Sequence, residues 1–286
     1  MNPVPNPVVP VANRFTRRHA LRLGGLGVVG AIVAACGSTS SNTTDGTGAS
    51  TASDVGSAAE ATTEATVDAA AATAAELASL SARDFASLGA CQLAPEKTAG
   101  PYPLDEQFNR RDVTEGMPGH PTRLGFRVLD DNCAPVSSAT VEIWHVDATG
   151  DYSAFVDNGG GKDSGPGTTF LRGTQPTNAD GIVEFHTVYP GWYRGRAVHI
   201  HLRVHMNDQI VLTSQVFFDA DYTASVYQSA PYSDNGLPDT PDESDNIAGD
   251  VKAEGTLMAT IAGPTLRGTG TVALINLGIN PTTLFG

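Results

Sequence analysis

The chain has 286 residues, of which 40% are hydrophobic, and this is enough for one compact domain of about 200 residues with its own core. The net charge of −14 at neutral pH makes nucleic acid an unfavourable partner. The first 36 residues carry four arginines and no acid, so the rest of the chain is more negative still. Attachment to an anionic membrane would therefore need a covalent anchor rather than a basic patch.

The N-terminus has the pattern of an export signal. Arg17 and Arg18 precede an apolar run, Leu23–Ala35, that is shorter than the ~20 residues needed to span a bilayer. The pair resembles a twin-arginine signal, with general secretion as the alternative. The run ends in Val-Ala-Ala-Cys36, which resembles a bacterial lipobox. We expect residues 1–36 to direct export and Cys36 to carry a lipid, the alternative being simple cleavage. The protein is thus expected at the outer face of the cytoplasmic membrane, or secreted.

The next segment, residues 37–85, consists almost entirely of Ala, Ser, Thr, Gly and acidic residues. Such a composition buries too little apolar surface to offset the entropy lost on ordering. We predict a disordered, flexible stalk here, and a folded domain over residues 86–286.

Three cysteines are present, an odd number for an exported chain. If Cys36 is lipidated, Cys91 and Cys133 remain as a pair in an oxidising compartment, which predicts a disulfide between them. Closing a loop of this length stabilises the fold by roughly 4 kcal/mol in the chain-entropy description. Two free buried thiols are the alternative.

After the stalk, short runs rich in β-branched and aromatic residues alternate with clusters of Gly, Pro, Asn and Asp. This pattern predicts an all-β fold, an antiparallel β-sandwich with long loops. The expected strands are Thr122–Leu129, Ala139–His145, Thr168–Arg172, Ile182–Thr187, Ala197–His205, Ile210–Phe218 and Gly270–Leu277. The segment Asp219–Pro241 is expected to be a long surface loop with one helical turn near Ala220–Tyr227.

Two histidines in the fifth expected strand are candidate metal ligands. Residues two apart on a strand point to the same side, so His199 and His201 present both imidazoles to one point. Taken alone, such a pair is often only a polar strand face. His205 lies about 13 Å further along the strand, too far to share the ion. His145 and His186 are interpreted as hydrogen-bonded structural residues.

Two longer strings make the pair specific. One is Val141-Glu-Ile-Trp-His-Val-Asp-Ala-Thr-Gly-Asp-Tyr152, and the other is Tyr189-Pro-Gly-Trp-Tyr193-Arg-Gly-Arg196-Ala-Val-His199-Ile-His201. Together they resemble the intradiol ring-cleaving dioxygenases. The resemblance runs from Cys91 to Phe218 and is faint after Asp219.

This resemblance implies Fe(III) bound by Tyr152, Tyr193, His199 and His201, in a non-haem dioxygenase that opens catechol-type rings to cis,cis-muconate-type diacids with dioxygen. Tyrosinate suits the hard ferric ion, and two phenolates with one hydroxide balance its charge. The resemblance also implies three roles besides metal binding. Tyr193 would leave the metal and act as a base, Arg196 would stabilise negative charge on the ring, and Gln215 would hydrogen-bond the substrate. Tyr102 is expected at the pocket mouth.

Two other functions stay open at this stage. A zinc or copper enzyme could use His199 and His201 with another ligand, which would leave the tyrosines unexplained. A stalk-tethered surface module could instead bind carbohydrate or an aromatic ligand through a vestigial metal site. The sequence decides neither the particular catechol nor the oligomeric state, for which a monomer or a sandwich-mediated oligomer is expected.

Overall fold

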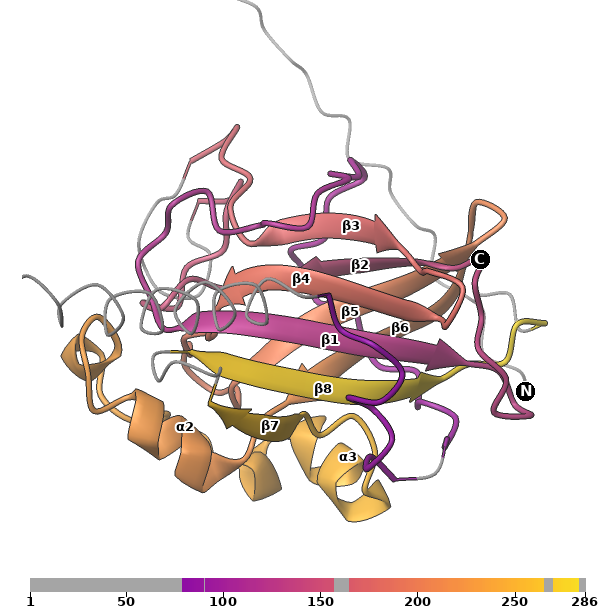
Figure 1. The fold of residues 1–286 in the computed structure, drawn as a ribbon. Coiled ribbons are helices and arrows are strands. Elements are labelled where there is room, and N and C mark those ends of the chain that lie inside the picture. Colours follow the sequence, from indigo (N-terminus) through magenta and orange to yellow (C-terminus); the bar gives the residue numbers. More distant parts are fainter. Residues whose placement is uncertain (1–78, 90, 157–164, 265–269, 283–286) are drawn as a thin grey trace, which may run out of the picture. The chain divides into compact units, whose positions relative to one another are not determined.

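The computed structural model describes residues 79–89, 91–156, 165–264 and 270–282 (Figure 1). The expected export signal, the anchor at Cys36 and the stalk up to residue 78 lie outside the described residues. Within the described ranges, no helix is both long and apolar enough to cross a membrane.

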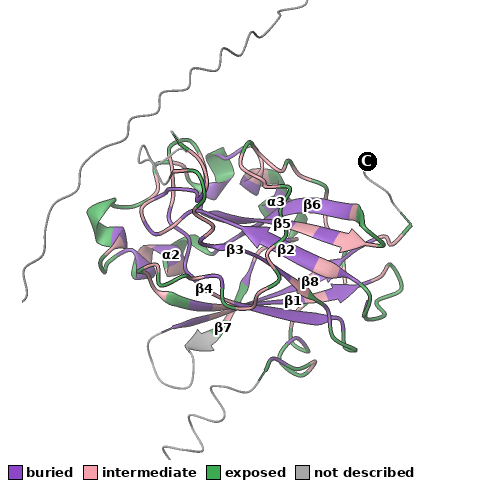
Figure 2. Ribbon diagram, turned by 90° about the horizontal axis from the view of Figure 1, so that it is seen from above, coloured by how far each residue is buried: buried purple, intermediate pink, exposed green. Residues whose placement is uncertain are grey.

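Two four-stranded sheets pack face to face, which confirms the predicted β-sandwich (Figures 1 and 2). In spatial order, the first sheet contains β4 (Ile182–Val188), β1 (Pro121–Leu129), β8 (Thr271–Gly278) and β7 (Thr260–Pro264). The second contains β3 (Arg172–Pro176), β2 (Thr140–Trp144), β5 (His199–Met206) and β6 (Gln209–Phe217).

Three details differ from the expectation, the first being β7, which was not among the seven expected strands. The strands β1 and β8 pair in parallel, so the first sheet is mixed rather than wholly antiparallel (Figure 1). These strands stand at opposite ends of the domain sequence, so no short hairpin forces them to run in opposite directions. The strand expected at Thr168–Arg172 instead begins at Arg172, because Thr168 and Thr169 belong to the loop before it.

The alternation of residues in β5 separates two faces of the second sheet. Ile200, Leu202 and Val204 are fully buried in the core between the sheets. His199 and His201, which alternate with them, therefore point to the other face. His199 and His201 are nevertheless buried, 3% and 1% exposed, whereas Arg203 and His205 further along the same face are only half-buried. The two candidate histidine ligands, His199 and His201, thus lie on a strand, at the buried end of its outer face.

The segment before β1 closes the edges of the sandwich. Residues 93 and 94 run beside the end of β8. Residues 95–98 run beside β6, where the Lys97 amide donates to the Thr213 carbonyl, and residues 108–113 run beside β3 and β4. Leu80 and Phe85 pack on the outside of the first sheet, so chain packing begins before the expected domain start at residue 86. This segment is also tied down by the predicted disulfide between Cys91 and Cys133, which is confirmed, with Cα atoms 5.6 Å apart.

The segment after β6 contains more regular structure than the expected loop with one turn. Its helix α2 (Ala220–Val226) matches the expected turn and is capped by the Asp219 side chain. Two 3₁₀ turns and a second helix, α3 (Ala248–Glu254), follow (Figure 1). Between the second 3₁₀ turn and α3, Asp245 contacts Arg196 and Ala197 just before His199, so this segment brings a side chain to the site described next.

Candidate metal centre

Four predicted ligand atoms converge at the start of β5. The Nε2 atom of His199 lies 3.4 Å from Tyr152 Oη, 3.3 Å from Tyr193 Oη and 3.2 Å from His201 Nε2. Atoms bound to one first-row metal at about 2.0 Å are separated by roughly 2.8–3.3 Å, depending on the bond angle. The donor spacing therefore suits a single shared ion.

The two tyrosines are brought together by a close contact between their loops. Gly150 has φ +96°, and a Cβ there would lie 2.2 Å from the Trp192 carbonyl oxygen. Across the same contact, a Cβ on Gly191 would lie 2.3 Å from the carbonyl oxygen of Asp147. Only glycine allows the two backbones to approach this closely. This contact explains why each tyrosine string contains a glycine two positions before its tyrosine.

His199 is held as a neutral imidazole whose Nε2 is free of a proton. Its Nδ1 lies 2.7 Å from the Ala197 carbonyl oxygen, and a carbonyl can only accept, so Nδ1 donates the hydrogen bond. Burial and the nearby positive charge of Arg196 lower the pKa of His199 to about 3. The Nε2 lone pair is therefore available to a metal at neutral pH.

His201 belongs to a row of side chains that crosses the second sheet. Arg172, Trp144, His201 and Gln215 are partners in register on β3, β2, β5 and β6. The Trp144 ring stacks on His201 with an interplanar angle of 3° and a centroid distance of 4.9 Å. Gly100 covers the ring edge, where an added Cβ would approach Cε1 to 3.2 Å. Packing therefore fixes the orientation of His201, although its buried Nδ1 has no hydrogen-bond partner among the described residues.

The two phenols are buried to different degrees. Tyr152 is completely buried, whereas Tyr193 is half-buried. Burial, followed by the mutual influence of the two phenols, raises the pKa of Tyr152 well above 10, and burial also raises the pKa of Tyr193. Both phenols are thus protonated when no cation is present, and a bound cation reverses that preference. The Tyr102 ring packs against Tyr152, with ring centroids 4.6 Å apart and an interplanar angle of 30°.

Arg196 and Gln215 lie directly beside the donor cluster. The Arg196 guanidinium donates to Gln215 Oε1 at 2.6 Å, and its Nη1 is 3.4 Å from Tyr193 Oη. The amide of Gln215 in turn donates to the Thr98 carbonyl oxygen at 2.8 Å. All six predicted site residues are therefore brought together.

One residue at the site was missed by the sequence reading. The carboxylate of Asp245 accepts from Arg196 Nε at 2.8 Å and is buried. Although burial opposes ionisation, hydrogen bonds from the Ala248 and Ala197 amides and from Arg196 lower the pKa of Asp245. Asp245 stands in the segment where the family resemblance was faint, 49 residues from Arg196, and no local pattern connects the two.

The remaining histidines of the strands have structural partners, as interpreted. Both ring nitrogens of the buried His145 are used, one by the Val146 carbonyl and one by the Thr187 hydroxyl, each at 2.7 Å. His186 pairs with Glu184, and His205 pairs with Glu142 instead of the donor cluster. In the described part of the chain, no group of three or more His, Cys, Asp or Glu side chains could hold a metal ion. A metal centre in this part of the chain therefore depends on the phenols.

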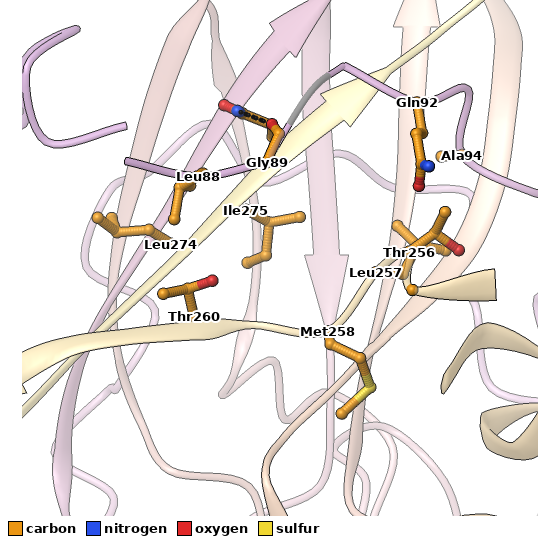
Figure 3. A pocket seen from close by; sticks show the side chains of 12 residues that line it. Leu88, Gly89, Gln92, Ala94, Thr256, Leu257, Met258, Thr260, Leu274 and Ile275 are labelled. Carbon is orange, nitrogen blue, oxygen red and sulfur yellow. Dashed lines mark hydrogen bonds between the residues drawn. The ribbon is translucent and has the colours of Figure 1, made fainter. Parts of the chain in front are cut away.

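The structure also contains a cavity of about 240 Å³, which Figure 3 shows with its lining side chains. Its lining residues come from the segment before β1, from the start of β7 and the segment before it, and from β8: Leu88, Gly89, Gln92, Ala94, Gly255, Thr256, Leu257, Met258, Thr260, Leu274, Ile275 and Asn276. None of the six predicted site residues lines it, and its lining contains no His, Cys, Asp or Glu. We therefore assign the chemistry to the donor cluster rather than to this cavity.

Comparison with known proteins identifies the family. The family model described as "Dioxygenase" matches residues 95–247, more than half of the chain. A solved intradiol ring-cleavage dioxygenase from Tetranychus urticae is 34% identical, covers 67% of this chain and 96% of its own, and superposes with a TM-score of 0.62. The chain belongs to the intradiol ring-cleavage dioxygenase family. The matched region includes the donor cluster and reaches Asp245. The similarity therefore extends beyond Asp219, after which the sequence resemblance was faint.

Other relatives of this intradiol dioxygenase carry the name of a substrate in their own names. A chlorocatechol 1,2-dioxygenase from Rhodococcus opacus is 28% identical over 42% of this chain and 52% of its own. A protocatechuate 3,4-dioxygenase β chain from Burkholderia cepacia is 31% identical over 42% of this chain and 54% of its own. The chain spans about half the length of the curated relatives it matches.

The family typically uses non-haem Fe(III), and the donor set present here fits that ion. Two phenols, one buried and one half-buried, supply hard anionic oxygen once ionised, and two neutral imidazoles complete the set. The Nε2 of His199 lies within 3.4 Å of all three other donor atoms.

Proposed function

We propose that this protein is a non-haem Fe(III) dioxygenase that cleaves catechol-type rings between the two hydroxyl-bearing carbons, giving cis,cis-muconate-type diacids. The observation that carries the proposal is the convergence of two phenols and two imidazoles on one point, with the Arg196 guanidinium against Tyr193. The proposed ligands are Tyr152, Tyr193, His199 and His201. Small aromatic diols and dioxygen are the proposed substrates.

A bound ferric ion would supply Lewis acidity to the catechol oxygens and withdraw electron density from the ring. The catechol must lose two protons, and the Oη of Tyr193, the less buried phenol, is placed to accept one of them. Arg196 brings a permanent cation to the side of the site where the substrate becomes negative. Tyr102 and Phe155, whose rings lie 5.2 Å apart beside Tyr152, form an aromatic wall for the ring to pack against.

Gln215 keeps Arg196 in reach of the substrate. Its carbonyl oxygen is used by Arg196 and its amide by the Thr98 carbonyl, so the side chain has little freedom to rotate. We therefore propose that Gln215 acts through Arg196 and through the shape of the pocket floor, where it neighbours His201 across β5 and β6.

The test combines metal analysis, a visible spectrum and oxygen uptake. The iron-loaded protein is expected to show the red-brown charge-transfer absorption of ferric tyrosinate and to consume one O₂ for each ring opened. Catechol, protocatechuate, hydroxyquinol and caffeoyl compounds form the substrate panel, with product identification. The variant Tyr152→Phe should lose iron and colour, whereas Tyr222→Phe, a half-buried tyrosine on α2 bonded to Thr271, should retain both.

The same measurements separate the alternatives. A colourless protein carrying stoichiometric zinc, or one carrying copper, would favour a different metalloenzyme built on His199 and His201. An iron-loaded, coloured protein that consumed no oxygen with any member of the panel would favour a ligand-binding module with a vestigial site.

We further propose that the protein is exported, with residues 1–36 as the signal, Cys36 as the lipid-bearing residue and residues 37–78 as the tether, since Leu80 and Phe85 already pack on the first sheet. What supports this is the N-terminal sequence pattern together with the Cys91–Cys133 disulfide, which suits an oxidising compartment. Cys36→Ser should move the protein from the membrane fraction to the soluble fraction. Normal export of an Arg17→Lys, Arg18→Lys variant would contradict the twin-arginine route.

A further inference from the structure

The chain segment between α2 and α3 returns to the loop that carries Tyr193. Trp192 Nε1 donates to the Gly236 carbonyl at 3.0 Å, and the Gly195 amide donates to Asp239 Oδ1 at 3.1 Å. Both contacts lie on the exposed side of the loop. The third and most buried contact belongs to Asp245, whose side chain is 1% exposed.

The two oxygens of Asp245 have separate partners. Oδ2 accepts from Arg196 Nε and from the Ala197 amide, both at 2.8 Å. Oδ1 accepts from the Ile247 and Ala248 amides, at 2.8 and 3.0 Å, where α3 begins. A single carboxylate therefore joins the start of a helix to the residues immediately before His199.

This arrangement determines where the Arg196 charge lies. With Nε bound to Asp245 and Nη2 bound to Gln215 Oε1, the planar guanidinium is held at two of its corners. The remaining nitrogen, Nη1, is thereby directed at the donor cluster, 3.4 Å from Tyr193 Oη and 3.5 Å from His199 Nε2. Without Asp245, the guanidinium would keep only its hydrogen bond to Gln215 and could rotate away from Tyr193.

We propose that Asp245 is a positioning residue that fixes the Arg196 guanidinium in its productive place beside Tyr193. This inference rests on the proposed function. Asp245 touches neither donor oxygens nor substrate, so its effect on the reaction passes through Arg196. Because charge on the substrate grows as the ring reacts, a displaced guanidinium should slow the chemical step more than it weakens substrate binding.

The test is a double-mutant cycle on the iron-loaded, full-length protein. Asp245→Asn keeps the volume and one acceptor oxygen but removes the charge. It is expected to lower kcat for catechol at least tenfold. The affinity for catechol without oxygen, measured by titrating the visible band under argon, should change less than threefold. In an Arg196→Gln background, Asp245→Asn should lower kcat by less than a further threefold, because the group it positions is already gone.

The control is Asp250→Asn, which removes one negative charge from the exposed face of α3, where Asp250 pairs with Lys97. It should leave kcat and the visible band unchanged. If kcat falls with Asp250→Asn as far as with Asp245→Asn, the effect is one of general charge, and the inference is wrong. Equal, multiplicative losses from Asp245→Asn in both backgrounds would also overturn it, since they indicate a structural role independent of Arg196.

A second test leaves Asp245 unchanged, so it does not depend on whether an Asp245 variant folds. Arg196→Lys keeps the charge but has no fork with which to bind Asp245 and Gln215 together. It should lose kcat to within threefold of Arg196→Gln, and near-normal kcat in this variant would refute the need for positioning. A wild-type protein without oxygen uptake would refute the proposed function itself. An active wild type in which Asp245→Asn lowers kcat by the same factor in both backgrounds would refute only the role of Asp245.

Discussion

The buried His145 gives a quantitative prediction about stability and pH. Its side chain is 0% exposed, and burial lowers its pKa to about 4, against 6.5 for a free histidine. The native protein therefore keeps His145 neutral at pH values where the unfolded chain already binds a proton. Stability falls as the pH drops from about 6.5 towards 4, because protonation then favours the unfolded state.

The magnitude follows from the difference of about 2.5 between the two pKa values, which corresponds to about 3 kcal/mol at most. Between pH 7 and pH 4.5, about 2 kcal/mol of this contribution is lost. Other carboxylates and histidines add their own pH dependence, so the relevant quantity is the difference between wild type and His145→Gln. The glutamine can still bond to the Thr187 hydroxyl but does not titrate.

Urea unfolding of both proteins, in the same metal state and at several pH values from 4.5 to 7.5, provides the assay. The wild type should lose about 2 kcal/mol more than His145→Gln over this range, whatever their absolute stabilities. Parallel curves for the two proteins would refute the reasoning. So would an NMR titration that placed the pKa of His145 near 6.5.

Three further outcomes are expected. Gly150→Ala should weaken iron binding at least tenfold, measured by competition with a chelator, because its Cβ would lie 2.2 Å from the Trp192 carbonyl oxygen. Replacing both Cys91 and Cys133 by serine should lower the free energy of unfolding by roughly 4 kcal/mol, and an unchanged urea midpoint would contradict this. Phe85→Ala should cost about 3–5 kcal/mol in the same assay, since Phe85 is 1% exposed against the first sheet, and a loss below 1 kcal/mol would show that the segment does not pack there.

The parts of the molecule that local sequence patterns describe were predicted well. Strand periodicity located the sandwich, because residues two apart share a face and this rule needs no knowledge of the tertiary fold. The pairing of Cys91 with Cys133 followed from counting the cysteines. The four candidate ligands came from two strings in which each tyrosine has a glycine two places earlier, and the close contact of Gly150 with Trp192 supplies the physical reason.

What the sequence reading missed depends on contacts between distant segments. The parallel pairing of β1 with β8 joins the two ends of the domain, and nothing in either strand encodes the direction of its partner. Leu80 and Phe85 stand in a segment of low-complexity composition, yet they pack because the outside of the first sheet offers an apolar surface. Asp245 resembles any other acid in an acidic loop until the fold places it against Arg196.

The two proposed tyrosine ligands differ in how firmly the fold holds them, and this difference suggests which one moves. Tyr152 is fully buried, packs against Tyr102, and is followed by Ser153, whose hydroxyl and carbonyl both accept from the buried Arg172 at 2.7 and 2.9 Å. Moving Tyr152 would break those bonds inside a low-dielectric region, where unpaired polar groups are costly.

Tyr193 stands in a half-exposed loop, followed by the exposed Arg194 and Gly195. Its side chain is therefore less confined than that of Tyr152, while the contacts of Trp192 and Ala197 hold the loop on either side. If both phenols held iron, Tyr193 would be the ligand whose displacement disturbs the core less, and its freed phenolate would be a base for the catechol. The burial of the two phenols thus supports Tyr193 as the departing ligand on grounds independent of family resemblance.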